Sequence, residues 1–521
     1  MYSLTENELA NRTAIVNNLS REVSDFNCKN FISLVPSDND LLLLGECTHG
    51  THEFYKIRSE ITKHLIENNG YKFVLIEAEW PCVYEINKFI NKKTNQYSSI
   101  QELLDKNMNK FPTWMWNNSV IADLIGWIKK YNANEEDEKK RINLFGIDCQ
   151  QFKGSYVFLE QFLKNYDKDF YEIITKNIGF LKQFNTEHHY AHEVVNGSLK
   201  KYINHIPLVM QELLSTYQWE HVDKLINNNR EDYGKLIDII ASEQNMEIIV
   251  NGEEYFRKML TEPRGSQASW NTRDQHMLTT IMRIRNRFQE ISDEIPKIVV
   301  WAHNSHIGNS NATNRGGKTF TENNTWNLGQ MAKEIFPNTY SIGFYTNTGT
   351  LTAGKGKNET TIQDIKKANC YSYEYIFSLV CVHTKMKQFL INLRNFKTQE
   401  RVTDNESIIM SEKIPGTYRC LYSGKIFNAV KRVTENNYIK LIDDKGETYI
   451  EYCRFTNISR RCLPIEYLLP ENTVDYLNTM QLQRWIGVNY MKSSELDSHY
   501  GESCMPEQYD SIGFIESTNH I

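Results

Sequence analysis

The chain has 521 residues, enough for two or three domains or for one large α/β domain with insertions. Its net charge of −6 and isoelectric point near 6.2 disfavour a general nucleic-acid-binding protein. No run approaches the roughly 18 apolar residues of a membrane helix, the amino terminus lacks the pattern of a signal peptide, and the cysteines form no C-x-x-C pair. These features predict a cytoplasmic protein without a membrane segment or structural disulfides.

Five short apolar runs predict buried β-strands. In chain order they cover residues 40–46, 71–79, 142–148, 297–304 and 339–346. The runs are nearly continuous in Leu, Ile, Val and Phe, and amphipathic helical patterns separate them. Because strands buried on both faces read in this way, the sequence predicts an α/β fold with a mostly parallel sheet covered by helices.

Two long segments interrupt this pattern. Residues from roughly 153 to 292 are polar, amphipathic and nearly free of proline, which predicts a large helical insertion. Residues 416–458 alternate apolar and polar side chains between turn signals, which predicts a small antiparallel β-barrel with a faint resemblance to SH3-like and Tudor modules. We therefore expect an α/β domain formed by residues 1–394 and 483–521, with a β-rich module inserted at 395–482.

Polar side chains follow four of the predicted strands. Glu46, Glu77 and Asp148 stand at the ends of the first three strands, and His303 and His306 follow the fourth. The carboxyl ends of parallel strands meet at one edge of a sheet, which is where open α/β sheets bind ligands. The sequence thus predicts one crevice to which four segments contribute.

The stretch "LLLLGECTHGTHEFYKIRSE", residues 41–60, carries the densest group of such residues. His49 lies in the turn before a predicted helix, so the turn aims it across the strand ends. Arg58 falls at the edge of that helix's apolar stripe, and a buried guanidinium needs an anionic partner. Glu46 and Glu77 are the expected partners.

The segment "VVWAHNSHIGNS" places His303 and His306 beside Asn304. Two histidines, with His49 and two glutamates expected nearby, suit proton transfer. The alternative is a buried ion-pair network that holds the strand ends together. The sequence contains no G-x-S-x-G, Walker A or H-E-x-x-H motif, which disfavours a serine α/β-hydrolase, a P-loop enzyme and a zinc protease.

Several blocks of the sequence resemble the erythromycin esterase family. They are "GECTHGTHEFYKIRSEITKHLIENNGYKFVLIEAEWP", "FPTWMW", "WNTRDQHM", "VVWAHNSHIG", "GFYTNTGTLTAG" and the ending from "RWIGVNY" onward. The resemblance covers about residues 1–394 and 483–521. It implies hydrolysis of a carboxylic ester or lactone, in characterised relatives a macrolide antibiotic, by a water molecule and without a covalent acyl-enzyme.

The resemblance also implies roles for matching residues. His49 would be the general base, Glu46 and Glu77 would orient the base and the water, and Arg58 would stabilise charge. His303 and His306 would bind the developing oxyanion or protonate the leaving alcohol. The residues expected to contact the substrate are Trp114, Trp116, Asp148 and Asn304.

These considerations lead to an antibiotic-resistance or metabolic esterase as the first hypothesis. It would need no cofactor, although a divalent metal could bind, and its partner would be a small-molecule ester or lactone and neither nucleic acid nor membrane. The alternative is a non-catalytic protein that binds a small molecule in the crevice and recruits a protein partner through residues 395–482.

Overall fold

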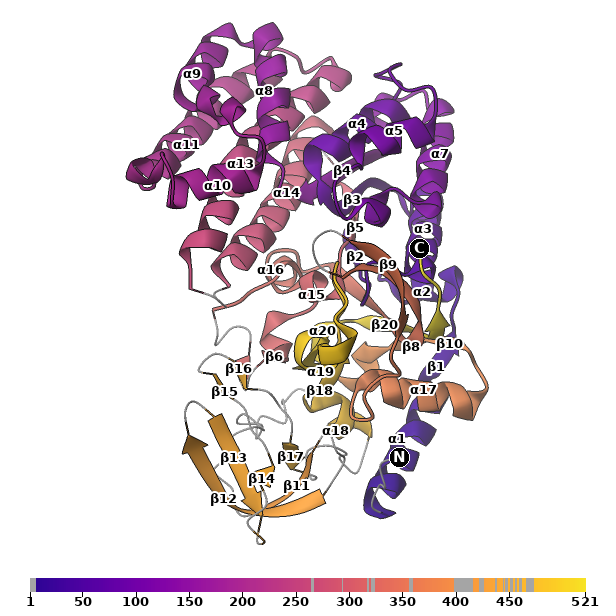
Figure 1. The fold of residues 1–521 in the computed structure, drawn as a ribbon. Helices are drawn as coiled ribbons and strands as arrows, with labels where there is room; N and C mark the ends of the chain where they lie inside the picture. The colour runs from indigo at the N-terminus through magenta and orange to yellow at the C-terminus, as the bar shows by residue number, and fades with distance from the viewer. Residues whose placement is uncertain are drawn as a thin grey trace.

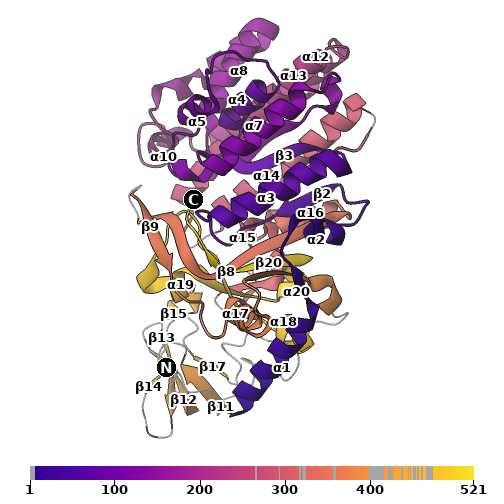
Figure 2. The same cartoon turned by 90° about the vertical axis from the view of Figure 1, so that its right-hand side faces the viewer.

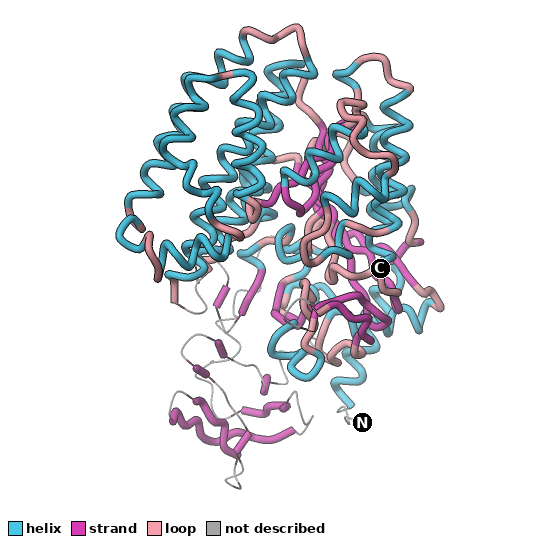
Figure 3. Tube along the Cα trace, turned by 45° about the horizontal axis from the view of Figure 1, so that its top comes forward, coloured by secondary structure: helices cyan, strands magenta, loops and turns pink. Residues whose placement is uncertain are grey.

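The computed structural model describes residues 6–263, 267–292, 294–315, 318–319, 324–355, 359–397 and 473–521, together with the backbone of short strands between 416 and 464. A nine-stranded sheet runs through the main body in the order β1-β10-β20-β8-β2-β5-β3-β4, with β9 paired to β8 (Figure 1). In Figure 3 the strands run between two groups of helices. Among the described residues, no helix is long and apolar enough to cross a membrane.

The five predicted strands form the centre of this sheet. They are β2 (Leu41–Leu44), β3 (Tyr71–Glu79), β4 (Asn143–Asp148), β5 (Lys297–Trp301) and β8 (Thr339–Gly354). All neighbouring pairs in the order β8-β2-β5-β3-β4 are parallel, and nearly every side chain in these strands is buried. The predicted α/β class with a mostly parallel sheet is therefore confirmed.

Four strands that the sequence pattern did not predict extend the sheet beyond β8. They are β1 (Val23–Asp25), β9 (Thr360–Ile365), β10 (Gln388–Asn392) and β20 (Ser511–Thr518). β20 runs parallel to β8, whereas β1, β9 and β10 pair antiparallel with their neighbours. The carboxyl-terminal strand thus lies inside the sheet, between β8 and β10.

Helices cover the sheet and connect its strands (Figure 2). They are α1 (Glu6–Glu22), α2 (Cys28–Leu34), α3 (His52–Asn69), α4 (Trp80–Ile90), α5 (Ile100–Asn107), α6 (Thr113–Trp116), α7 (Ser119–Ala133), α15 (Asn304–Ile307), α16 (Leu328–Ile335) and α17 (Tyr373–Thr384). The predicted stripe of α3 is buried, and the helix ends at Gly70, whose φ of 73° is the left-handed conformation that glycine adopts readily. β3 begins at the next residue.

Between β4 and β5 the described residues form helices and no strand. The helices are α8 (Phe152–Tyr166), α9 (Lys168–Ile178), α10 (Glu187–Val195), α11 (His205–Thr216), α12 (Asp223–Asn227), α13 (Tyr233–Thr261) and α14 (Ala268–Ser292). α13 packs against α8, α10 and α14, and α14 returns the chain to the sheet and contacts β4. This returning helix brings side chains from the helical segment to the strand ends.

A second sheet lies beside the carboxyl end of the chain. It consists of β18 (Gln481–Arg484), β19 (Tyr500–Ser503), β6 (Thr313–Arg315) and β7 (Lys318–Thr319), in that order. The segment from 485 to 499 between β18 and β19 contains α19 (Glu495–His499) and forms part of the wall of the cavity described below.

The insertion at 395–482 contains β11 (Gly416–Cys420), β12 (Ile426–Glu435), β13 (Tyr438–Asp443), β14 (Thr448–Tyr449) and β17 (Cys462–Pro464). Their backbones pair antiparallel in the order β14-β13-β12-β11-β17. β15 (Cys453–Arg454) and β16 (Asn457–Ile458) form a separate pair. Much of the remaining insertion and all side chains of these strands lie outside the described residues, so the domain boundaries and the SH3-like or Tudor-like barrel stay predictions.

Candidate active site

A cavity of about 890 Å³ opens at the carboxyl ends of the central strands. The six residues at its chemical centre are His49, Glu77, Asp148, Arg273, His303 and His306. They come from the turn after β2, the ends of β3 and β4, helix α14, and the turn after β5. The ends of these strands therefore meet at one cavity, as predicted. Helix α14 is a fifth segment that contributes to it.

In the turn after β2, the side chain of Glu46 holds the ring of His49 through its Nδ1 atom. Nδ1–H of His49 donates to Oε1 of Glu46 at 3.0 Å, and Oε2 of Glu46 accepts from Nη2 of Arg58 at 2.5 Å. Because a carboxylate can only accept, this hydrogen bond fixes the tautomer and leaves Nε2 of His49 available as a base. His49 itself lines the cavity, whereas Glu46 and Arg58 lie behind it.

Arg58 is fully buried, as its position on α3 predicted. Its guanidinium lies over the rings of Tyr55 and Trp301, at 4.7 and 4.9 Å, and its Nε donates to the carbonyl of Phe54. The expectation of an anionic partner holds for Glu46 but is wrong for Glu77. β5 lies between β2 and β3, so the ends of those two strands are not adjacent, and Glu77 pairs with Arg273 instead.

Replacing Arg58 with methionine should leave Glu46 buried beside no cation. We expect Arg58→Met to lower the free energy of unfolding by about 3–5 kcal/mol, the usual effect of removing one partner of a buried pair. Urea unfolding would measure this loss. The double variant Glu46→Gln/Arg58→Met should recover part of it, and additive losses in the two single variants would contradict the pairing.

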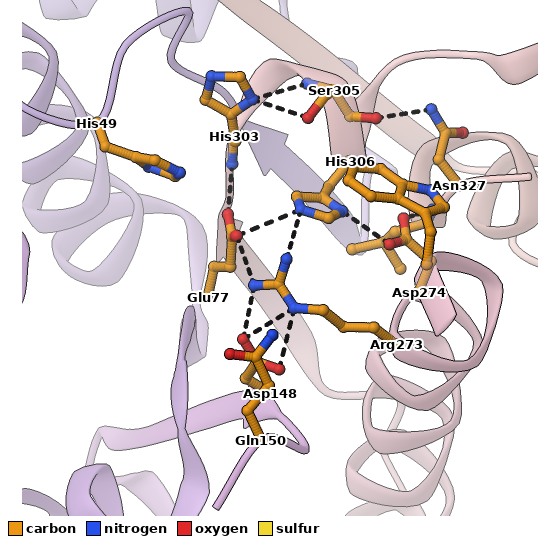
Figure 4. Close-up of polar contacts among 12 residues, drawn as sticks. His49, Glu77, Asp148, Gln150, Arg273, Asp274, His303, Ser305, His306 and Asn327 are labelled. Carbon is orange, nitrogen blue, oxygen red and sulfur yellow. Dashed lines mark hydrogen bonds and ion pairs between the residues drawn. The ribbon is translucent and has the colours of Figure 1, made fainter. Parts of the chain in front are cut away.

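Glu77 is the hub of the second half of the site (Figure 4). Its Oε2 accepts from the backbone N–H of His303 at 2.8 Å, and its Oε1 lies 2.8 Å from Nη2 of Arg273 and 3.3 Å from Nε2 of His306. Burial alone would raise the pKa of Glu77, but the charges of His306 and Arg273 outweigh it and hold the pKa well below its ordinary value. Glu77 is therefore an anion at neutral pH.

Arg273 joins Glu77 to Asp148. Its Nε donates to both carboxylate oxygens of Asp148, at 3.1 and 3.0 Å, and its Nη2 lies 2.6 Å from Oδ2. Its Nη1 lies 3.0 Å from Nε2 of His306. One guanidinium thus positions two carboxylates and lies against the ring of His306.

His306 is held from three sides. Its Nδ1–H donates to Asp274 at 2.8 Å, its ring stacks on Trp270 at 4.4 Å, and its Nε2 faces Glu77 and Arg273. Burial would lower the pKa of His306, but the carboxylates of Asp274 and Glu77 together raise it to about 9. At neutral pH His306 is an imidazolium whose Nε2–H is directed at Glu77. When it loses that proton, Nε2 can accept from Arg273.

His303 has the opposite character. Burial first, and then the neighbouring His49, lower the pKa of His303 well below its ordinary value, so the ring is neutral. Its Nδ1 accepts from the backbone N–H of Ser305, which places the ring proton on Nε2. Within the described part of the chain no group accepts from Nε2 at hydrogen-bonding geometry, although the backbone of Cys47 is near enough to the ring to oppose the fall in its pKa. The ring centroid lies 4.7 Å from that of His49, and Figure 4 shows His49 directed towards it.

Of the four residues expected to contact the substrate, two line the cavity and two do not. Asp148 and Trp116 line the cavity, and the indole N–H of Trp116 donates to the carbonyl of Glu77 at 3.0 Å. Trp114 and Asn304 are not among the lining residues. The amide of Asn304 donates to the carbonyl of Phe344 and lies against Gly45, where a Cβ would stand 2.0 Å from its Oδ1. Asn304 thus packs the turn after β2 against the sheet.

Three residues of the site, Arg273, Asp274 and Trp270, do not stand at a predicted strand end and were not among the predicted site residues. All three stand in α14, which the pattern assigned to the helical insertion, and the signal that could have found them is the charged pair within "WNTRDQHM". Among the described residues, no group of three or more His, Cys, Asp or Glu side chains is arranged to hold a metal ion. His188 lines the cavity against Phe256, while His192, four residues later, is mostly exposed.

The sheet and the cavity together define an α/β protein whose site combines a carboxylate-held imidazole, an unpaired imidazole N–H and an arginine–carboxylate cluster. These are groups with which enzymes activate water and bind developing negative charge. A family model described as erythromycin esterase matches residues 66–518. The chain belongs to the erythromycin esterase family, as the sequence blocks predicted. The matched range begins after Glu46, His49 and Arg58.

Individual relatives agree with this assignment. The chain is 23% identical over 326 residues to "Putative hydrolase YbfO" of Bacillus subtilis (strain 168). This alignment covers 61% of the chain and 67% of YbfO. A Bacillus cereus protein of solved structure matches 98% of both chains with 16% identity and a TM-score of 0.64. A variant of the erythromycin esterase EreC in its open conformation matches 95% of this chain and 94% of its own, with 13% identity and a TM-score of 0.54. Family membership and the YbfO similarity support hydrolase activity.

Proposed function

We propose that the protein hydrolyses a carboxylic ester or lactone by direct attack of water that His49 activates. The observation that carries this proposal is the pair of imidazoles at the cavity, one with Nδ1 held by Glu46 and the other with an unpartnered Nε2–H. The first suits a general base and the second suits a donor to a developing oxyanion. The family makes macrolide lactones the first substrates to test, with a cytoplasmic resistance enzyme as the corresponding role.

Each group has a part in the proposed reaction. Nε2 of His49 takes a proton from water, and the new hydroxide attacks the ester carbonyl to give a tetrahedral oxyanion. Nε2–H of His303 donates to that oxyanion. As the carbon–oxygen bond to the alcohol breaks, the imidazolium of His49 returns its proton to the leaving oxygen. The products are a carboxylic acid and an alcohol. For a lactone both groups belong to one molecule, which is heavier than the substrate by one water.

His306 contributes through its charge in this scheme. Both of its nitrogens already face protein groups, whereas Nε2 of His303 does not. We therefore assign oxyanion binding to His303 and the fixed positive charge to His306. Glu77 holds the two histidine segments together through the backbone N–H of His303 and the ring of His306.

Mass spectrometry of chelator-treated protein incubated with erythromycin, simpler lactones and aryl esters tests the proposal. We expect a product heavier by one water and, in samples quenched during turnover, protein of unchanged mass. We expect chelation to have no effect, because Glu46, Glu77 and Asp148 are each already bonded to an arginine. An acylated protein would contradict direct water attack, and intact compounds throughout would contradict an esterase of these substrate classes.

The pH profile should report the charge of His306. Because its pKa is raised to about 9, the imidazolium is present below that pH and is lost above it, so kcat/KM should fall by about tenfold on an alkaline limb near pH 9. Asp274→Asn removes the carboxylate that raises this pKa and should move the limb to lower pH. An unmoved limb in that variant would assign the limb to another group.

A further inference from the structure

The cavity contains a second charged group of residues that the proposed reaction does not use. Glu79 at the end of β3, Glu187 at the start of α10 and Lys110 before α6 all line the cavity, and we call them the acidic subsite. Glu79 follows Glu77 by two residues, and an irregularity in β3 between Ile76 and Glu79 brings Glu79 opposite Asp148 of β4. Oε1 of Glu187 lies 4.0 Å from Nζ of Lys110.

Glu187 lacks a close, buried counter-charge in the acidic subsite. At the catalytic end, Glu77 and Asp148 are paired with Arg273 and His306. The acidic subsite has two carboxyl groups beside a single lysine, and the side chain of Lys110 is 59% exposed. His188, next to Glu187 in the chain, and Cys82, whose pKa burial and then Glu79 raise, also line the cavity. A surface lysine at that distance compensates one buried carboxylate only weakly.

The carboxyl oxygens themselves provide a second observation. Glu187 is only 8% exposed, yet its Oε1 has no hydrogen-bond partner within the described residues, and the same holds for Oε2 of Glu79. Burial first, and then the charge of Asp148, raise the pKa of Glu79 well above its ordinary value, which favours its neutral form, so the ion pair of the subsite is that of Glu187 with Lys110. A buried carboxyl oxygen without a partner is costly, and a bound group that donates to it would remove that cost.

We propose that the acidic subsite binds a protonated amine of the substrate while the ester group lies at His49 and His303. This inference rests on the proposed esterase function and defines its substrate class as esters or lactones that carry a cationic nitrogen. A substrate hydroxyl could hydrogen-bond to the same oxygens but would leave Glu187 with the exposed Lys110 as its counter-charge. An ammonium group supplies both the hydrogen bond and the charge.

Two matched series of benzoate esters test the proposal. One series contains dimethylaminoalkyl benzoates, and the other contains their isosteres in which carbon replaces nitrogen. In both series the alkyl tether between the ester and the amine, or its carbon replacement, has several lengths. At pH 7 the amine is protonated. For the best tether we expect the wild-type protein to prefer the cationic ester in kcat/KM by about tenfold or more. Glu187→Gln should remove most of this preference, and Lys110→Met should increase it because the competing cation is gone. Glu172→Gln, an exposed glutamate on α9, is the matched control and should leave the preference unchanged.

A preference that is absent at every tether, or that Glu187→Gln does not reduce, overturns the proposal. Calorimetry with the corresponding benzamides separates this failure from a failure of the esterase function. If neither ester series is hydrolysed, the cationic benzamide should still bind more tightly than its carbon isostere, and Glu187→Gln should abolish the difference. Equal binding of the two benzamides to the wild-type protein would exclude the cation subsite.

Discussion

His49→Ala should reduce kcat for ester hydrolysis by about 10²–10⁴-fold, the range that a positioned general base contributes. The ring of His49 is the group that Glu46 orients at the cavity, and its loss leaves water without a base beside His303. KM should change little, because the imidazole acts on water in the transition state. Steady-state kinetics on any ester that the wild-type protein hydrolyses would measure the effect.

The same stretch of chain offers a matched control. His52 lies three residues after His49, begins α3 and is not among the residues that line the cavity. His52→Ala should retain turnover within about twofold of the wild type, because the partly buried side chain of His52 does not reach the cavity. Added imidazole should restore part of the activity of His49→Ala by filling the vacated space. Turnover by His49→Ala within a few-fold of the wild type would assign the base to another residue.

The centre of the fold was predictable because its physics is local. Strands buried on both faces must be almost wholly apolar, and residues 41–44, 73–76, 144–147 and 298–301 are. The edge of the sheet escaped prediction for the converse reason. β1 has three residues with an exposed pattern, and β9 alternates exposed and half-buried side chains. Such segments become strands through their neighbours, which one sequence does not reveal.

Part of the candidate site was likewise predictable from local sequence, and part depends on the tertiary fold. Glu77, Asp148 and His303 could be placed at one edge because parallel strands end together, whatever their order in the sheet. Pairing across the site depends on that order. Glu77 could not be assigned to Arg273 in advance, because the assignment requires knowing that β5 separates β2 from β3 and that α14 returns to β4. Residues on returning helices and on the segment from 485 to 499 carry no strand-end signal.

Arg273→Met should lower both stability and activity. The variant leaves Glu77 and Asp148 buried without their shared guanidinium, and we expect the free energy of unfolding to fall by about 3–5 kcal/mol. We also expect kcat to fall by about 10²-fold or more, because Arg273 orients the carboxylate that holds the His303 backbone and the His306 ring. Urea unfolding and steady-state kinetics on one preparation would measure both losses.

Arg287 on the same helix separates the two effects. Its side chain is 16% exposed, as that of Arg273 is, and it pairs with Glu243 and Asp223 away from the cavity. Arg287→Met should therefore lose stability but keep kcat. A fall in kcat as large as that of Arg273→Met would mean that activity follows stability alone.

The ionisation of Glu77 gives a readout that a purely structural role would not change. Burial raises the pKa of Glu77, and His306 and Arg273 lower it well below its ordinary value, so Glu77 stays ionised until the pH falls through that lowered pKa. Without Arg273 one of the charges that lower this pKa is gone, so the pKa of Glu77 should rise. The carboxyl ¹³C NMR signal of Glu77, assigned by its absence in Glu77→Gln, should accordingly titrate at higher pH in Arg273→Met and return part of the way in Arg273→Lys, which keeps the charge but loses the bidentate contact with Asp148. Titration of Glu77 at the same pH in all three proteins would show that Arg273 does not act through Glu77.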